Sequence, residues 1–141
     1  MGNHVLTTSL IAWVITQSAK VLVDFFKTHH LHIGLWASPG GMPSSHAAFV
    51  SALATAVGLD QGFGSALFAA CVVFASVVMY DAAGVRRAAS IQARLINQIV
   101  DELFQGQPIR EERLRELLGH TPIEVVVGAL MGVLIAWWLA T

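Results

Sequence analysis

Hydrophobic residues run along the chain in windows long enough to cross a lipid bilayer. Three windows are largely apolar, from Val5 to Phe26, from Ser65 to Tyr80 and from Ile123 to Ala140. A hydrocarbon core of about 30 Å needs roughly 20 helical residues. A fourth window, from His46 to Leu59, is shorter and rich in alanine. The pattern predicts an all-α, integral membrane four-helix bundle.

The polar segment between the third and fourth windows has a different periodicity. Within AASIQARLINQIVDELF, Ile91, Leu95, Ile99 and Leu103 recur every four residues, which predicts an amphipathic interfacial helix that lies along the membrane surface or against the bundle. The stretch REERLRELL predicts a second, more charged helix. No repeat, low-complexity tract or linker divides the chain, so we expect one membrane-embedded domain over residues 1–141.

The amino-acid composition also favours a membrane protein. Of the 141 residues, 55% are hydrophobic and 12% are charged, whereas soluble domains carry about 25% charged residues. The N-terminal stretch lacks the basic start and the cleavage site of a signal peptide, so we expect a retained first helix. Cys71 is the one cysteine of the sequence and can form no internal disulfide.

Basic residues are concentrated in two of the segments that join the windows. Lys27 follows the first window, and six arginines follow the third: Arg86, Arg87, Arg94, Arg110, Arg113 and Arg115. By the positive-inside rule we expect both segments in the cytoplasm, both termini outside and the protein in the plasma (inner) membrane. Because no domain is strongly basic, we expect these arginines to meet anionic lipid head groups and not nucleic acid.

The end of the first window carries a polar face. Lys20, Asp24 and Lys27 are spaced by four and three residues, which places them on one side of a helix. Charged residues within a membrane segment are costly and mark a candidate functional site. Two structural explanations remain open for Lys20, because it could extend to the membrane surface or pair with Asp24.

Two histidines stand at the starts of the second and fourth windows. His46 follows Pro-Ser-Ser, where the free N–H groups of a helix start favour an anion. His120 begins the stretch HTPIE. Each motif also has a structural explanation, since Pro-Ser-Ser is a serine-capped helix start and Thr-x-x-Glu is a capping box.

Together these groups have the chemistry for phosphoryl transfer to a histidine. A neutral imidazole is a competent nucleophile, a carboxylate beside it fixes its tautomer, and a second imidazole protonates the leaving alkoxide. Cations and N–H groups stabilise the charge on the phosphoryl oxygens. This mechanism requires no metal or cofactor, and we expect none. His29, His30 and His32 could bind a metal, but an interfacial loop is favoured because carboxylates and thiols are lacking nearby.

These motifs resemble those of the type 2 phosphatidic acid phosphatase and vanadium haloperoxidase superfamily. Its pattern is Lys, six residues and Arg-Pro; then Pro-Ser-Gly-His; then Ser-Arg, five residues, His, three residues and Asp. The stretch KVLVDFFK from Lys20 resembles the first element, PSSH ending at His46 the second, and HTPIE from His120 the end of the third. GGMPSSHAA, YDAAGVRRAA and LLGHTPIEV are similar to a divergent membrane branch, the acid phosphatase/vanadium-dependent haloperoxidase-related proteins. This resemblance covers most of the chain.

The resemblance implies a role for each candidate residue. His120 would be the nucleophile, Glu124 its orienting carboxylate and His46 the general acid that later activates water. The implied phosphate-binding residues are Lys20, Ser44, Ser45, one of Arg86 and Arg87 and, as a weaker candidate, Lys27. Apart from the resemblance, the sequence makes Asp24 and Asp81 candidate supporting residues. The chain departs from the pattern at Lys27, Ser45 and Glu124, which replace arginine, glycine and aspartate. No Ser-Arg pair precedes His120 at the family spacing, so Arg86 or Arg87 is assigned that role.

We therefore expect a phosphatase that hydrolyses a lipid or isoprenoid mono- or diphosphate at the cytoplasmic membrane face through a phosphohistidine. The alternative is a non-catalytic membrane protein that binds phosphate or lipid head groups, as a scaffold or transporter. Vanadate-dependent peroxidase chemistry is less favoured, because a membrane-facing pocket suits a lipid better. Gly128 and Gly132 form a GxxxG pair, through which we expect a homodimer.

Overall fold

The structure is a computed structural model that describes residues 3–30, 32, 34, 36, 41–103 and 120–140. This part of the chain forms five helices and no strand. The helices are α1 (His4–Thr28), α2 (Ser45–Gln61), α3 (Ala66–Ala83), α4 (Val85–Leu103) and α5 (Pro122–Ala140). The all-α prediction is therefore confirmed.

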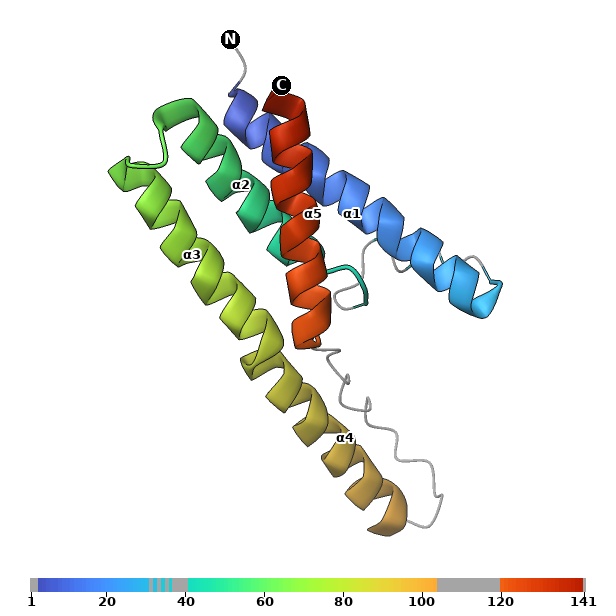
Figure 1. Cartoon of the computed structure of the whole chain (residues 1–141). Coiled ribbons are helices and arrows are strands. Elements are labelled where there is room, and N and C mark those ends of the chain that lie inside the picture. The colour runs from blue at the N-terminus through green and yellow to red at the C-terminus, as the bar shows by residue number, and fades with distance from the viewer. Residues whose placement is uncertain are drawn as a thin grey trace.

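Three of these helices, α1, α3 and α5, are long and apolar enough to cross a membrane. α2 has 17 residues, a length of about 25 Å at 1.5 Å per residue, and it packs against all three. The arrangement is compatible with the predicted helical membrane bundle, in which α2 is the central and shortest of four helices (Figure 1).

The small residues of α2 explain its central position. Eleven of its residues are buried, among them Ala47, Ala48 and Ala52, whereas α3 buries only Ala75 and Ala82. A helix enclosed by neighbours needs small side chains, because within lipid close backbone packing replaces the hydrophobic effect as the source of association. The large apolar residues of α1, α3 and α5 are instead exposed on the outside of the bundle, as expected for surfaces that face lipid.

The GxxxG pair of α5 packs against α2 within the same chain. A Cβ atom built on Gly128 would lie 3.0 Å from the carbonyl carbon of Ser44, and one on Gly132 would lie 2.9 Å from that of Ala48. Both glycines are buried. The expectation that a second copy docks on this face is therefore wrong, because α2 already occupies it. A homodimer stays a prediction and requires another surface.

α4 continues the path of α3 after Gly84 and extends away from the bundle (Figure 1). Among the described helices it packs only against α3. Ile91, Leu95, Ile99 and Leu103, which the sequence places on one face, are all more than half exposed. The predicted amphipathic helix is confirmed, whereas the second one, REERLRELL, lies outside the described residues.

The two ends of the bundle carry different features. The chain termini and the α2–α3 turn lie at one end, and the start of α2, the start of α5 and α4 lie at the other (Figure 1). At the first end, His4 of α1 pairs with Asp60 of α2 at 3.0 Å. The chemistry-bearing residues of the sequence analysis are at the second end.

Candidate active site

At the start of α5, the HTPIE motif forms a capping box whose glutamate also contacts His120. Thr121 and Glu124 form the capping box, in which the Thr121 N–H donates to Glu124 Oε2 at 3.0 Å and the Glu124 N–H donates to Thr121 Oγ1 at 3.4 Å. The same Oε2 lies 3.2 Å from Nδ1 of His120. The carboxylate therefore fixes the orientation of the imidazole while it caps the helix. The ring nitrogen that does not contact Glu124 is Nε2.

His46 lies beside His120 although the two residues are 74 positions apart in the sequence. Their ring centroids are separated by 6.4 Å, with the ring planes inclined by 59°. His120 is buried and His46 is exposed. Two hydrogen bonds of about 2.7–3.2 Å that meet on one oxyanion would span such a gap. The arrangement thus allows one phosphate to contact both imidazoles.

Main-chain hydrogen bonds hold the helix ends that carry these residues. The His120 N–H donates to the carbonyl oxygen of Ala82 in α3 at 3.2 Å, and the Ser44 N–H donates to the carbonyl oxygen of Glu124 at 3.1 Å. Below them, Ala47, Ala82 and Val125 form a buried apolar cluster. The ends of α2, α3 and α5 are therefore fixed against each other at the site.

The two serines before His46 differ in their hydrogen bonding. Ser44 is the N-cap of α2, and its hydroxyl accepts from the Ala47 N–H at 3.4 Å. Ser45 is 1% exposed, and its Oγ has no hydrogen-bond partner among the described residues. A buried hydroxyl without a partner is costly, so Ser45 is available to bind a group that enters at this helix start.

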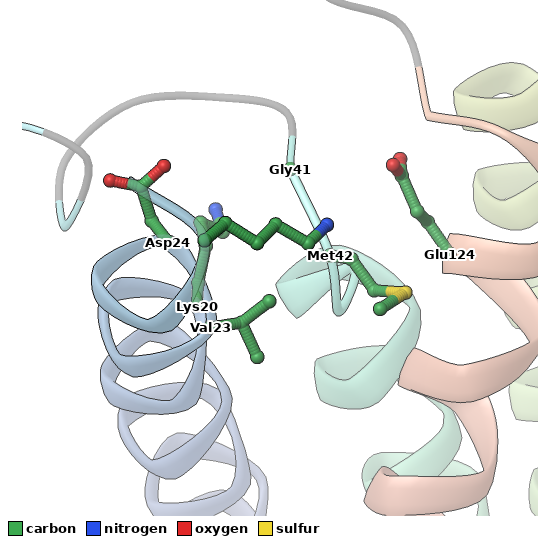
Figure 2. Close-up of a pocket in the computed structure, with 7 residues that line it drawn as sticks. Lys20, Val23, Asp24, Gly41, Met42 and Glu124 are labelled. Carbon is green, nitrogen blue, oxygen red and sulfur yellow. The ribbon is translucent and has the colours of Figure 1, made fainter. Parts of the chain in front are cut away.

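Lys20 lies almost fully inside the protein, with 2% of its surface exposed. Gly41 lies against the stem of Lys20, and its φ of +83° favours glycine because other residues rarely adopt that backbone conformation. Figure 2 shows the Lys20 side chain extending from α1 toward Met42, with Glu124 on the neighbouring helix. The burial of Lys20 means that its side chain does not extend to the surface, and Glu124 is one of the charged groups that act on its ammonium.

An open pocket of about 130 Å³ is lined in part by Lys20. Its charged lining consists of Lys20, Asp24 and Glu124, which are labelled in Figure 2, together with Lys27. The predicted polar face of α1 therefore does line one pocket. The imidazoles of His46 and His120 are not among the lining residues, and the pocket meets the imidazole pair through Glu124, which belongs to both.

Asp24 pairs with a loop histidine. Its Oδ2 lies 2.8 Å from Nδ1 of His32. Among the described residues, Asp24 therefore pairs with His32 and not with Lys20, which was the alternative that the sequence left open. No group of three or more histidine, cysteine or acidic residues that could hold a metal occurs in the described part of the chain. Lys27 is exposed at the pocket rim.

The remaining candidates lie at the junction of α3 and α4. Asp81 is in the last turn of α3, and Arg86 and Arg87 are in the first turn of α4, shortly after the Ala82 carbonyl that binds His120. The side chains of Arg86 and Arg87 lie outside the described structure, so their phosphate-binding role stays a prediction.

Three contacts of pocket or loop residues were not predicted from the sequence. Met42 lines the pocket, His32 pairs with Asp24, and Trp36 packs edge-to-face on Trp13 at a centroid distance of 5.5 Å. Irregular loops have no periodicity that would reveal such contacts. An acidic residue facing a histidine-rich loop was the one available signal for the His32 contact.

An all-helical bundle with apolar outer faces and polar groups gathered at one end defines a helical membrane protein. The family model "Divergent PAP2 family" matches residues 1–135, and the chain belongs to this family. The chain is also similar to the Bacillus subtilis (strain 168) protein named "Uncharacterized membrane protein YuiD". The two are 42% identical over 151 residues, which cover 99% of this chain and 96% of that protein. No solved structure matches.

Proposed function

We propose that the protein is a phosphatase that hydrolyses a lipid or isoprenoid phosphate through a phosphohistidine intermediate. The observation that carries the proposal is the approach of His46 and His120 to a centroid distance of 6.4 Å. Membership of the Divergent PAP2 family agrees with this chemistry. Phosphoryl transfer to an imidazole needs no metal, since the cations and N–H groups of the site would carry the charge.

In the proposed first step, Nε2 of His120 attacks phosphorus and the bond from phosphorus to the alcohol oxygen breaks. His46 donates a proton to the departing alkoxide. In the second step His46 takes a proton from water, the resulting hydroxide attacks phosphorus, and the P–N bond breaks to release phosphate. Glu124 supports both steps because its contact with Nδ1 keeps Nε2 directed at phosphorus and stabilises the positive ring.

The charge on the phosphoryl oxygens would be held by groups from several elements. The N-terminal turn of α2 would supply main-chain N–H groups, Ser45 a buried hydroxyl without a described partner, and Lys20 a buried ammonium. Lys27 and either Arg86 or Arg87 would complete the set. Lys27 contributes least in this proposal, because exposed charges are screened by water.

The proposed site is on the cytoplasmic side of the plasma membrane, with both termini outside. The distribution of arginine and lysine supports this orientation, because the candidate residues and α4 are at the end of the bundle opposite the termini. A substrate whose tail lies in the bilayer would bring its phosphate to this level.

A second candidate function, non-catalytic binding of phosphate or head groups, is favoured by one observation. The pocket around Lys20 is not lined by either imidazole, so a ligand could be held there without contact to the proposed nucleophile. The replaced third motif of the superfamily pattern agrees with a loss of turnover.

An assay of phosphate release from purified protein in lipid nanodiscs distinguishes a phosphatase from a non-catalytic binding protein. The substrates are phosphatidylglycerophosphate, phosphatidate and a prenyl phosphate, with His120→Ala and His46→Ala as test variants. His4→Ala, which removes a paired histidine at the far end of the bundle, is the matched control. We expect no phosphate release in His120→Ala and a loss of about 10²–10⁴-fold in His46→Ala. Binding that persists in His120→Ala, together with no turnover by the wild type, would identify a binding protein instead.

A further inference from the structure

The pocket between α1 and α5 carries balanced charge. Lys20 and Lys27 contribute two positive groups, and Asp24 and Glu124 contribute two negative ones. A site that holds only a phosphate would be expected to present cations and N–H donors. With about 130 Å³, the pocket exceeds the 10–15 Å³ that one water needs by roughly tenfold, so it has room for a polar group of several atoms.

Each carboxylate of the pocket has one oxygen that accepts no hydrogen bond from the described residues. Oε2 of Glu124 is bonded to His120 and to the Thr121 N–H, and Oδ2 of Asp24 is bonded to His32. Among the described residues, no hydrogen bond reaches Oε1 of Glu124 or Oδ1 of Asp24. The two carboxylate side chains are 21% and 27% exposed, so they are partly shielded from water and still open to the pocket.

These groups define what the pocket complements. A phosphate dianion offers only acceptors, which suit Lys20 and Lys27 but oppose the carboxylates. Hydroxyl and ammonium groups are donors, which suit the carboxylate oxygens and are strengthened by their charge. The complementary ligand therefore carries both a phosphate and a neighbouring donor.

We propose that this pocket binds the polar part of the substrate's alcohol, so that the protein selects phosphate esters with a hydroxyl or ammonium group close to the phosphate over esters of plain hydrocarbon alcohols. The phosphate half of this proposal rests on the proposed function. Glu124 links the two parts of the site, because its Oε2 contacts His120 and its Oε1 would accept a hydrogen bond from the head group in this proposal.

Three single-chain phosphate monoesters of similar length test this selection. Octadecyl phosphate has no donor on its alcohol, 1-oleoyl lysophosphatidate has a hydroxyl, and sphinganine 1-phosphate has a hydroxyl and an ammonium. The measurements are kcat/KM for phosphate release and, separately, the rise in the melting temperature of the full chain in detergent with each lipid. We expect both donor-bearing lipids to exceed octadecyl phosphate by about tenfold or more in kcat/KM, the effect of one hydrogen bond to a charged group.

Variants of Asp24 connect the selection to the pocket. Asp24→Ala removes the acceptor, and we expect the preference for both donor-bearing lipids to fall by about tenfold. Asp24→Asn keeps a neutral acceptor, so it should lose preference for the ammonium more than for the hydroxyl. The ratio between substrates within one variant is compared, which removes any change in total activity or folded fraction. Asp60→Asn, from the His–Asp pair at the other end of the bundle, should keep the wild-type ratio.

The outcomes separate this inference from the proposed function. Equal kcat/KM for the three lipids, or an unchanged preference in Asp24→Ala, overturns the inference and leaves the phosphatase standing. Selective thermal stabilisation by the donor-bearing lipids that Asp24→Ala abolishes, with no phosphate release, supports the pocket and overturns the phosphatase. Equal stabilisation by all three lipids without turnover overturns both.

Discussion

Replacing Gly128 by alanine tests the contact that positions the site. The added Cβ would lie 3.0 Å from the carbonyl carbon of Ser44 and 3.1 Å from its Cβ, and closer still to the carbonyl oxygen. Ordinary contacts between carbon atoms are about 3.5–4.0 Å. Because the opposing atoms include backbone at the start of α2, they cannot rotate away, and α5 must move outward by about 0.5–1 Å.

Two effects of opposite sign set the size of the change. Overpacking costs about 1–3 kcal/mol, whereas alanine in a helix is favoured over glycine by about 0.5–1 kcal/mol. The steric cost wins, and we expect a net loss of about 1–2 kcal/mol in the free energy of unfolding. The same movement separates Ser44 from Glu124, whose main-chain bond is 3.1 Å long, so phosphate release should fall by roughly 10²-fold.

The assay is SDS titration of the protein in mild-detergent micelles, followed by helical circular dichroism. Gly64→Ala is the matched control, because no atom lies within 4 Å of its added Cβ and its backbone is not in the left-handed region. The control should change stability by less than about 0.5 kcal/mol. If Gly128→Ala unfolds at the same SDS fraction as the wild type, the close packing of α5 on α2 described above is incorrect.

Three further predictions concern the hydrogen bond of Ser51, the two lysines of the pocket and the surroundings of α4. Ser51→Ala removes the 2.9 Å hydrogen bond to the Ala129 carbonyl and should lower stability by about 0.5–1.5 kcal/mol, whereas Ser76→Ala, whose hydroxyl bonds within its own helix, should be neutral in the same titration. Lys20→Met should lower kcat/KM for phosphate release about 10–100-fold and Lys27→Met less than about fivefold; equal losses would contradict the buried role of Lys20. A spin label at position 95 of α4 should be accessible to oxygen and shielded from a water-soluble nickel complex. A label at position 97 should show the reverse accessibilities. Equal accessibilities at the two positions would exclude a helix at the membrane surface.

Local sequence rules were sufficient for the features that depend on neighbouring residues. The Thr-x-x-Glu spacing predicted the capping box at the start of α5, and four-residue spacing predicted the exposed apolar face of α4. The approach of His46 to His120 followed from two helix starts that the loop pattern placed at one end of the bundle. These features follow from short-range geometry and from the direction of successive helices.

Features that depend on which helix faces meet could not be predicted in this way. A membrane helix that is apolar on all sides has no stripe to reveal its partner, so the sequence could not show that α2 is central or that Gly128 and Gly132 face it. The GxxxG pair fits a contact within one chain and a contact between two chains equally well. The bond between His32 and Asp24 depends on the path of an irregular loop.

The two main-chain bonds at the site, from His120 to Ala82 and from Ser44 to Glu124, involve no side-chain atom. Any residue except proline can form them, so mutation can alter the reactive groups while the scaffold beneath them persists. Proteins with this fold can therefore replace aspartate by glutamate, or lose catalytic activity, and still keep the same helix packing.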